Sequence, residues 1–208
     1  MDNNVLVRKV YNELCFLEKC GFKTWYSKAW ELVFKYKLKP KSNLDAFKLE
    51  SKYNIKNAFI KKWLYDVKDI QSNPILKTYS IFKQDFGLET YLEKVTNSKY
   101  RHALIKLRTS SHDLNIELGR HKDRHDIQKR LCHRCHVIED ENHFLNVCPL
   151  YKIERKNLYD IYGINDNTVQ TNDDILMRLM NSKYQHHLEA LAKYTHTCFN
   201  IRREAVNS

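Results

Sequence analysis

Three cysteines and one histidine lie close together in the sequence at a spacing typical of metal sites. They form the pattern Cys132-x2-Cys135-x7-His143-x4-Cys148. A Cys-x2-Cys pair folds into a tight turn that directs two sulfurs to one point, and a second pair close behind can complete a tetrahedron. Three thiolates and one imidazole leave no position open for water. The pattern therefore predicts a structural zinc ion rather than a catalytic one.

Three histidines could supply the fourth ligand of this site, because His133 and His136 lie in the same segment as His143. We favour His143, since only a short spacer separates it from Cys148, whereas the other two histidines adjoin cysteine ligands and are expected to point away. The remaining cysteines fall in segments with helical periodicity, and we expect them to pack as thiols in the core. They are Cys15, Cys20 and Cys198.

The composition restricts the class of protein to which these residues belong. The chain has 208 residues, which is enough for one domain or for one domain with a small module. It contains only 4 glycines and 3 prolines, which argues against an all-β fold and against glycine-rich phosphate loops. It has no apolar run of about 18 residues and no signal-peptide pattern at its N-terminus. We therefore expect a cytoplasmic or nuclear protein that does not bind a membrane.

Positive charge is concentrated beside the cysteine cluster. The formal net charge is +11, and residues 99–136 contribute ten basic against four acidic side chains. Such a patch favours RNA or DNA as a partner, because binding a polyanion releases its counterions. The alternative is a solvated basic surface with no particular partner. The candidates for phosphate contacts are eight of these ten basic residues, Arg101, Lys106, Arg108, Arg120, Arg124, Lys129, Arg130 and Arg134.

Hydrophobic periodicity predicts helices through most of the chain. Leu104, Leu107 and Leu114 indicate one basic helix over residues 98–119, with Gly119 as its C-cap. Other helices are expected near residues 3–20, 25–38, 55–70, 90–95, 150–162, 173–181 and 184–203. We therefore predict a mainly α fold, a multi-helix domain with a small inserted Cys3His zinc module. Its expected regions are a helical N-terminal region (1–97), the basic helix with the zinc module (98–165) and a C-terminal helical tail (166–208).

Aromatic residues are frequent in the N-terminal half of the chain. Trp25, Trp30 and Trp63 each lie in a predicted helix among other apolar residues. The simpler interpretation places them in the core. The alternative is a surface that binds a protein partner.

Around the cysteines the sequence resembles a known family. Residues 107–155 read LRTSSHDLNIELGRHKDRHDIQKRLCHRCHVIEDENHFLNVCPLYKIER. This stretch resembles the C-terminal region of the reverse-transcriptase polyproteins of LINE-like (non-LTR) retrotransposons. Those chains commonly carry R-x-S-S-H-x-L-x-I-E-x-G-R, then Cys-x2-Cys, acidic residues, His-Phe and Cys-Pro-x-Tyr. More loosely, the resemblance extends over about residues 75–205.

The resemblance implies a zinc-binding appendage that handles nucleic acid, with Cys132, Cys135, His143 and Cys148 as the ligands. A reverse transcriptase also needs an aspartate pair on a tight hairpin to hold two metal ions. The only Asp-Asp pair here is Asp173-Asp174, whose surroundings predict the start of a helix. We therefore expect no polymerase, endonuclease or other enzyme activity. Two alternatives stay open, a zinc-ordered protein-interaction module and a non-functional transposon remnant.

Overall fold

The computed structural model describes residues 3–39, 43–121, 126–164 and 171–207. The chain divides into two compact units, Met1–Trp63 and Leu64–Ser208, and each is described by itself. The described residues form helices and no β-strand, apart from one isolated bridge between Leu131 and Ile138. The prediction of a mainly α fold is therefore confirmed.

The first unit contains α1 (Asn3–Lys19), α2 (Trp25–Lys35) and most of α3 (Leu44–Lys68). Gly21 follows α1 with a φ of 86°, a conformation that glycine adopts without strain. α1 and α2 meet through the Tyr11 and Tyr26 rings, whose centroids are 5.3 Å apart. Among the side chains described in this unit, no hydrophobic one is fully buried, and Trp25 is 68% exposed. The prediction that the tryptophans occupy a core is therefore wrong for Trp25.

The second unit holds the hydrophobic core. Its helices after α3 are η1 (Pro74–Leu76), α4 (Lys77–Phe82), α5 (Thr90–Lys94), α6 (Ser98–Arg108), α7 (Asn115–His121), η2 (Ile127–Lys129), η3 (His143–Val147), η4 (Pro149–Tyr151), α8 (Lys152–Tyr162), α9 (Asn172–Met180) and α10 (Gln185–Asn207).

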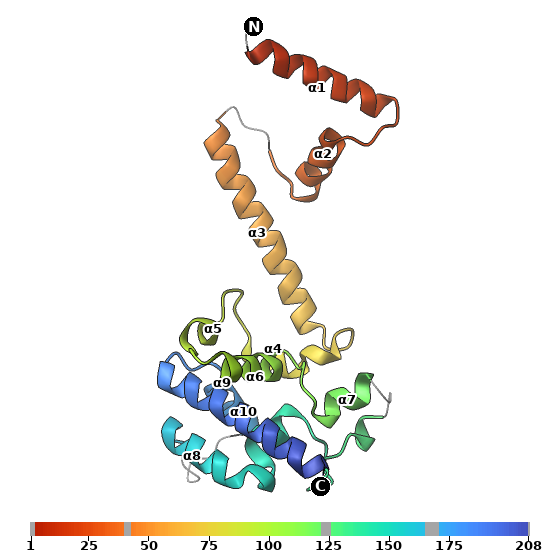
Figure 1. The fold of residues 1–208 in the computed structure, drawn as a ribbon. Helices are drawn as coiled ribbons and strands as arrows, with labels where there is room; N and C mark the ends of the chain where they lie inside the picture. Colours follow the sequence, from red (N-terminus) through yellow and green to blue (C-terminus); the bar gives the residue numbers. More distant parts are fainter. Residues whose placement is uncertain (1–2, 40–42, 122–125, 165–170, 208) are drawn as a thin grey trace. The chain divides into compact units, whose positions relative to one another are not determined.

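The long helix α10 organises this core. It packs against α6 and α8, as Figure 1 shows within the second unit. One face of α10 is buried at Leu188, Leu191, Thr195 and Cys198. α8 ends at Gly163, whose left-handed backbone (φ 59°) closes the helix as a C-cap.

The unit boundary at Trp63 and Leu64 differs from the predicted boundary at residues 97 and 98. Sequence composition did not show that Phe82 of α4, Tyr91 of α5 and Val95, which follows α5, lie in the same core as α6 and α10. Residues 64–97 therefore belong with the Cys3His module and with the C-terminal helices.

The single helix expected over residues 98–119 is two helices, α6 and α7, separated by a turn. Ser110 has a φ of 51°, and its hydroxyl donates a hydrogen bond to Glu141 at 2.6 Å. Gly119 lies inside α7 and is not a C-cap. A Cβ added there would lie 2.7 Å from Cγ of Arg130, so this glycine makes room for a side chain that crosses the helix.

Candidate metal centre and basic groove

The first two cysteines lie on a short turn closed by backbone hydrogen bonds. The amide of Cys132 donates to the carbonyl of Val137 at 2.7 Å, and that of His136 donates to the carbonyl of Cys132 at 2.9 Å. His136 takes a left-handed conformation (φ 57°), which reverses the chain after the second cysteine. The predicted tight turn therefore carries Cys132 and Cys135.

The second pair of candidate ligands lies at the two ends of a short π-helical segment, η3. The Asp140 carboxylate accepts a hydrogen bond from the His143 amide at 2.8 Å, which fixes the start of this segment. At its end the Cys148 amide donates to the His143 carbonyl at 2.8 Å. The buried side chain of Arg155 donates to the Cys148 carbonyl at 2.6 Å.

The structure brings the four predicted ligands together. One donor atom from each of Cys132, Cys135, His143 and Cys148 lies within 4.8 Å of the others. The Cys148 sulfur is 3.9 Å from that of Cys132 and 3.6 Å from that of Cys135. A tetrahedron with metal–sulfur bonds of about 2.3 Å has an edge of about 3.8 Å. The sulfurs are thus too far apart for a disulfide and are spaced for a shared metal ion.

The protonation chemistry of the cluster also fits a metal ion. Burial lowers the pKa of His143, which favours the neutral imidazole that a metal binds. Its buried Nε2 has no hydrogen-bond partner among the described residues. Burial raises the pKa of the Cys148 thiol to about 12 and also raises the pKa of Cys135. Three neighbouring sulfurs cannot all ionise in such a place without a cation, so the donor set matches a bound metal.

Two acidic residues between the ligand pairs, Glu139 and Glu141, hold the segment to the rest of the unit. Glu139 is buried, and both of its carboxylate oxygens accept hydrogen bonds from Arg202 at 2.7 Å. The Asn115 amide also donates to Glu139 at 2.8 Å. The cysteine turn is therefore attached to the start of α7 and to the last part of α10.

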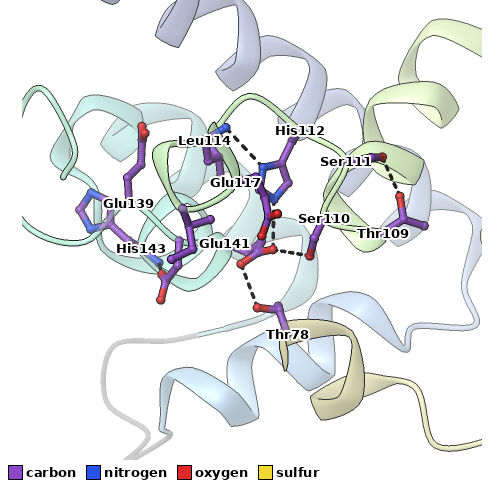
Figure 2. Close-up of polar contacts among 12 residues, drawn as sticks. Thr78, Thr109, Ser110, Ser111, His112, Leu114, Glu117, Glu139, Glu141 and His143 are labelled. Atoms are coloured by element: carbon purple, nitrogen blue, oxygen red, sulfur yellow. Dashed lines mark hydrogen bonds and ion pairs between the residues drawn. The ribbon is translucent and has the colours of Figure 1, made fainter. Parts of the chain in front are cut away.

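Glu141 makes a second attachment, to the turn that follows α6. Figure 2 shows its carboxylate accepting hydrogen bonds from Thr78 (2.8 Å), Ser110 (2.6 Å) and His112 (3.1 Å). The Leu114 amide donates to Nδ1 of His112, so the proton that faces Glu141 is on Nε2. Burial alone would raise the pKa of Glu141, but the hydrogen bonds from His112 and Ser110 bring that pKa down to about 2. The residues resemble a hydrolase triad in type, yet Ser110 and His112 both bind the carboxylate instead of each other.

Among the predicted phosphate contacts, Arg108 is a structural residue. Its side chain is 2% exposed and donates to the Met180 carbonyl at 2.6 Å and to Glu89 at 2.7 Å. Its guanidinium also lies 4.4 Å from the centroid of the Phe82 ring. The core therefore holds Arg108, and a phosphate group on the surface cannot reach it.

Three other predicted phosphate contacts already interact with groups of the protein itself. Arg101 donates to the Val95 carbonyl at 2.9 Å, and Arg130 donates to the Ile116 carbonyl at 2.9 Å. Arg120 forms an ion pair with Glu117 at 3.2 Å. Lys129 and Arg134 are exposed, whereas Arg124 lies outside the described residues.

The last of the predicted contacts, Lys106, lies in a groove of about 440 Å³ between α6 and α10. Lys99 lies two helical turns before Lys106 on the same face of α6, and Arg203 lines the groove from α10. Within the described parts of the chain these three cations form no ion pair, and no carboxylate lines the groove. By contrast, the cleft beside Glu141 is lined by Glu117, Asp140 and Asp173 among its charged residues.

Sequence reasoning did not include Lys99, Arg203 or the aromatic residue Phe199 among the candidate site residues. Phe199 and His196 lie one turn apart on α10 and line the same groove as Arg203. The signal for them was present in the helical spacing, because residues 196, 199 and 203 share one face of a helix. Only the packing of α10 against α6 shows that this face meets the basic face of α6.

Comparisons of the chain with protein-family models, with curated proteins and with solved structures gave no match. Within the described residues, no helix is long and apolar enough to cross a membrane. The site therefore has to be interpreted from its own residues.

Proposed function

We propose that this chain is a zinc-stabilised module that binds RNA or DNA, as in the C-terminal region of the LINE-like reverse-transcriptase polyproteins that its sequence resembles. The observation that carries the proposal is the groove between α6 and α10. Lys99, Lys106 and Arg203 face it without acidic neighbours among its lining residues. Unpaired cations in a concave surface raise the local potential and attract a polyanion.

Zinc is the metal that best fits the donor set in this proposal. Three cysteine sulfurs and one imidazole at tetrahedral spacing are a common structural zinc site, and they leave no position for substrate. Metal analysis of the purified protein tests this part. We expect one zinc ion per chain, and cobalt substitution should give the absorption of a tetrahedral sulfur-rich site. An octahedral spectrum, or no bound metal, would contradict the assignment.

Fluorescence anisotropy with labelled RNA and DNA tests the nucleic-acid part. The readout is the slope of log affinity against log salt from about 50 to 200 mM. Neutralising the three groove cations should weaken binding about tenfold or more and reduce the slope by about 2 for a single strand. The groove variant is Lys99→Gln/Lys106→Gln/Arg203→Gln.

A matched control removes the same amount of charge elsewhere in the second unit. Lys152, Lys156 and Lys193 are exposed and do not line the groove. The triple glutamine variant at these three positions should bind as the unchanged protein does. Equal losses in both variants would show that only the total charge matters, and absence of binding at low salt would refute the proposed function.

The exposed aromatic side chains of the first unit favour one alternative, a protein-interaction module. Trp25 and Phe34 are examples, and neither is covered among the described residues. That function predicts binding to a protein partner that tolerates salt and is not displaced by polyanions. The anisotropy experiment distinguishes the two functions, because only the nucleic-acid module responds to the groove variant.

A further inference from the structure

The groove between α6 and α10 carries aromatic rings as well as cations. Phe199 lines it, and its ring packs against Phe144 with centroids 5.0 Å apart. His196 lines it too, and its ring lies 5.3 Å from that of Tyr100. Both rings are therefore held by neighbouring rings before any ligand arrives.

Aromatic rings between cations are of no use to a ligand that offers only phosphate groups. A nucleic-acid duplex presents its backbone outward and keeps its bases paired and stacked inside, whereas an unpaired strand can place bases on aromatic side chains. Each base stacked in this way contributes about tenfold or more to the affinity. A groove that combines rings and cations should thus bind an unpaired strand more tightly than a duplex.

The spacing of the cations suits a short piece of such a strand. Lys99 and Lys106 are two turns apart on α6, a rise of about 10.5 Å along the helix. At about 3.4 Å per stacked nucleotide, this distance corresponds to about three nucleotides. Arg203 stands on the opposite wall, on α10, one turn beyond Phe199. A strand lying along α6 would therefore have its phosphates near the lysines and its bases toward α10.

We infer that this groove binds single-stranded nucleic acid in preference to a duplex, with bases stacking on Phe199 and His196 and phosphates bound by Lys99, Lys106 and Arg203. The inference rests on the proposed nucleic-acid function and adds the form of the ligand. The shared chemistry is an unpaired polynucleotide strand, and both RNA and DNA offer it.

The test compares four ligands of about twelve nucleotides, a length within the range of single-strand sites. They are a single-stranded RNA, the DNA of the same sequence, a duplex, and an abasic strand that keeps the phosphates without the bases. The full chain is loaded with zinc, and binding is followed by anisotropy. We expect at least one single strand to bind about tenfold more tightly than both the duplex and the abasic strand. The RNA and DNA arms then show which sugar is preferred.

Two variants locate the effect in the groove. Phe199→Leu keeps an apolar contact for Phe144 and removes the ring, and His196→Ala removes the second ring without touching that contact. Circular dichroism checks that each is folded, and the second variant serves if the first is not. Each folded variant should lose several-fold in affinity for the single strand, with unchanged duplex binding and salt slope.

The possible failures separate the two proposals. If no nucleic acid binds, the proposed function fails and the inference fails with it. If the duplex or the abasic strand binds as tightly as the single strands, the nucleic-acid function stands and the single-strand inference is wrong. The inference is also wrong if both ring variants keep the preference for the single strand.

Discussion

The metal-ligand segment (residues 131–148) and the α6–α10 helix pair are stabilised in different ways. The helix pair buries regularly spaced leucines, such as Leu104, Leu107, Leu188 and Leu191. The metal-ligand segment contributes Phe144 and Leu145 to the core, but its other buried side chains are candidate ligands and acids. Apolar burial therefore holds the helices, whereas the ion pairs and hydrogen bonds of Glu139 and Glu141 hold the segment, together with the metal ion that we propose. The two regions should respond differently to the same kind of perturbation.

Loss of a ligand should separate the two regions most strongly. Cys148→Ser removes a ligand that both other cysteine sulfurs approach. Zinc contributes about 10–16 kcal/mol to the folding of small zinc modules, so the segment should lose its order while the helix pair keeps most of its own. Hydrogen exchange read by mass spectrometry should show faster exchange in residues 131–148 than in α6 and α10.

Cys20→Ser is the control for this prediction, because Cys20 is exposed in the first unit. It should leave the metal content and the exchange pattern unchanged. Exchange in residues 131–148 that is the same in Cys148→Ser and in the unchanged protein would show that the segment does not need the metal.

Breaking the attachment of the segment to α10 should have the next largest effect on stability. Arg202→Met leaves the buried Glu139 carboxylate without its charged partner, which typically costs about 3–5 kcal/mol. Arg203→Met changes the adjacent exposed residue and should alter the free energy of unfolding by less than about 0.5 kcal/mol. Urea denaturation measures both.

The Arg203→Met variant is also informative about the proposed nucleic-acid binding. Arg203→Met should weaken it because Arg203 lines the groove, although it leaves stability unchanged. Equal stability losses in the two variants would mean that the Glu139 pair does not distinguish the segment from the helix surface.

The smallest effect on stability is expected from a change at Gly119 in α7, which lies against the side chain of Arg130, just before the metal-ligand segment. Gly119→Ala would place a Cβ 2.7 Å from Cγ of Arg130. Overpacking costs about 1–3 kcal/mol, and the better helix propensity of alanine returns up to about 1 kcal/mol. We expect a net loss of about 1 kcal/mol in the free energy of unfolding.

Gly87→Ala is the matched control, because no atom other than those of Gly87 and its two chain neighbours lies within 4 Å of the position its Cβ would take. It should change stability by less than about 0.5 kcal/mol. The cost of Gly119→Ala should shrink in an Arg130→Ala background. An unchanged cost there would show that the loss has another cause than this contact.

The sequence predicted the parts of the site that depend on local spacing. The four candidate ligands occupy one short stretch, and a tight turn with a following helical segment is enough to bring them together. The burial of Arg108 and Arg202 was not predictable in the same way, because their partners, Glu89 and Glu139, come from other parts of the chain. Charge counting treats every arginine as a surface cation, whereas Arg108 and Arg202 donate hydrogen bonds to groups inside the protein.

The break between α6 and α7 escaped the sequence for a related reason. The leucines at 104, 107 and 114 fit one helical face, and periodicity alone favours a continuous helix. α6 ends at the turn that contains Ser110 and His112. The side chains of these two residues bind the carboxylate of Glu141, which lies 31 and 29 residues further along the chain. A partner so distant in sequence leaves no periodic signal.

The position of Arg202 has a consequence for the order in which the protein is assembled during synthesis. The four candidate ligands leave the ribosome well before α10, so a nascent chain could bind the proposed metal ion early. The charged partner of Glu139, Arg202, is synthesised 63 residues later in the chain. α10 also forms one wall of the basic groove. The groove that we propose for nucleic acid is thus completed only when α10 emerges, and a nascent chain could not yet bind a strand there even with metal at the four candidate ligands.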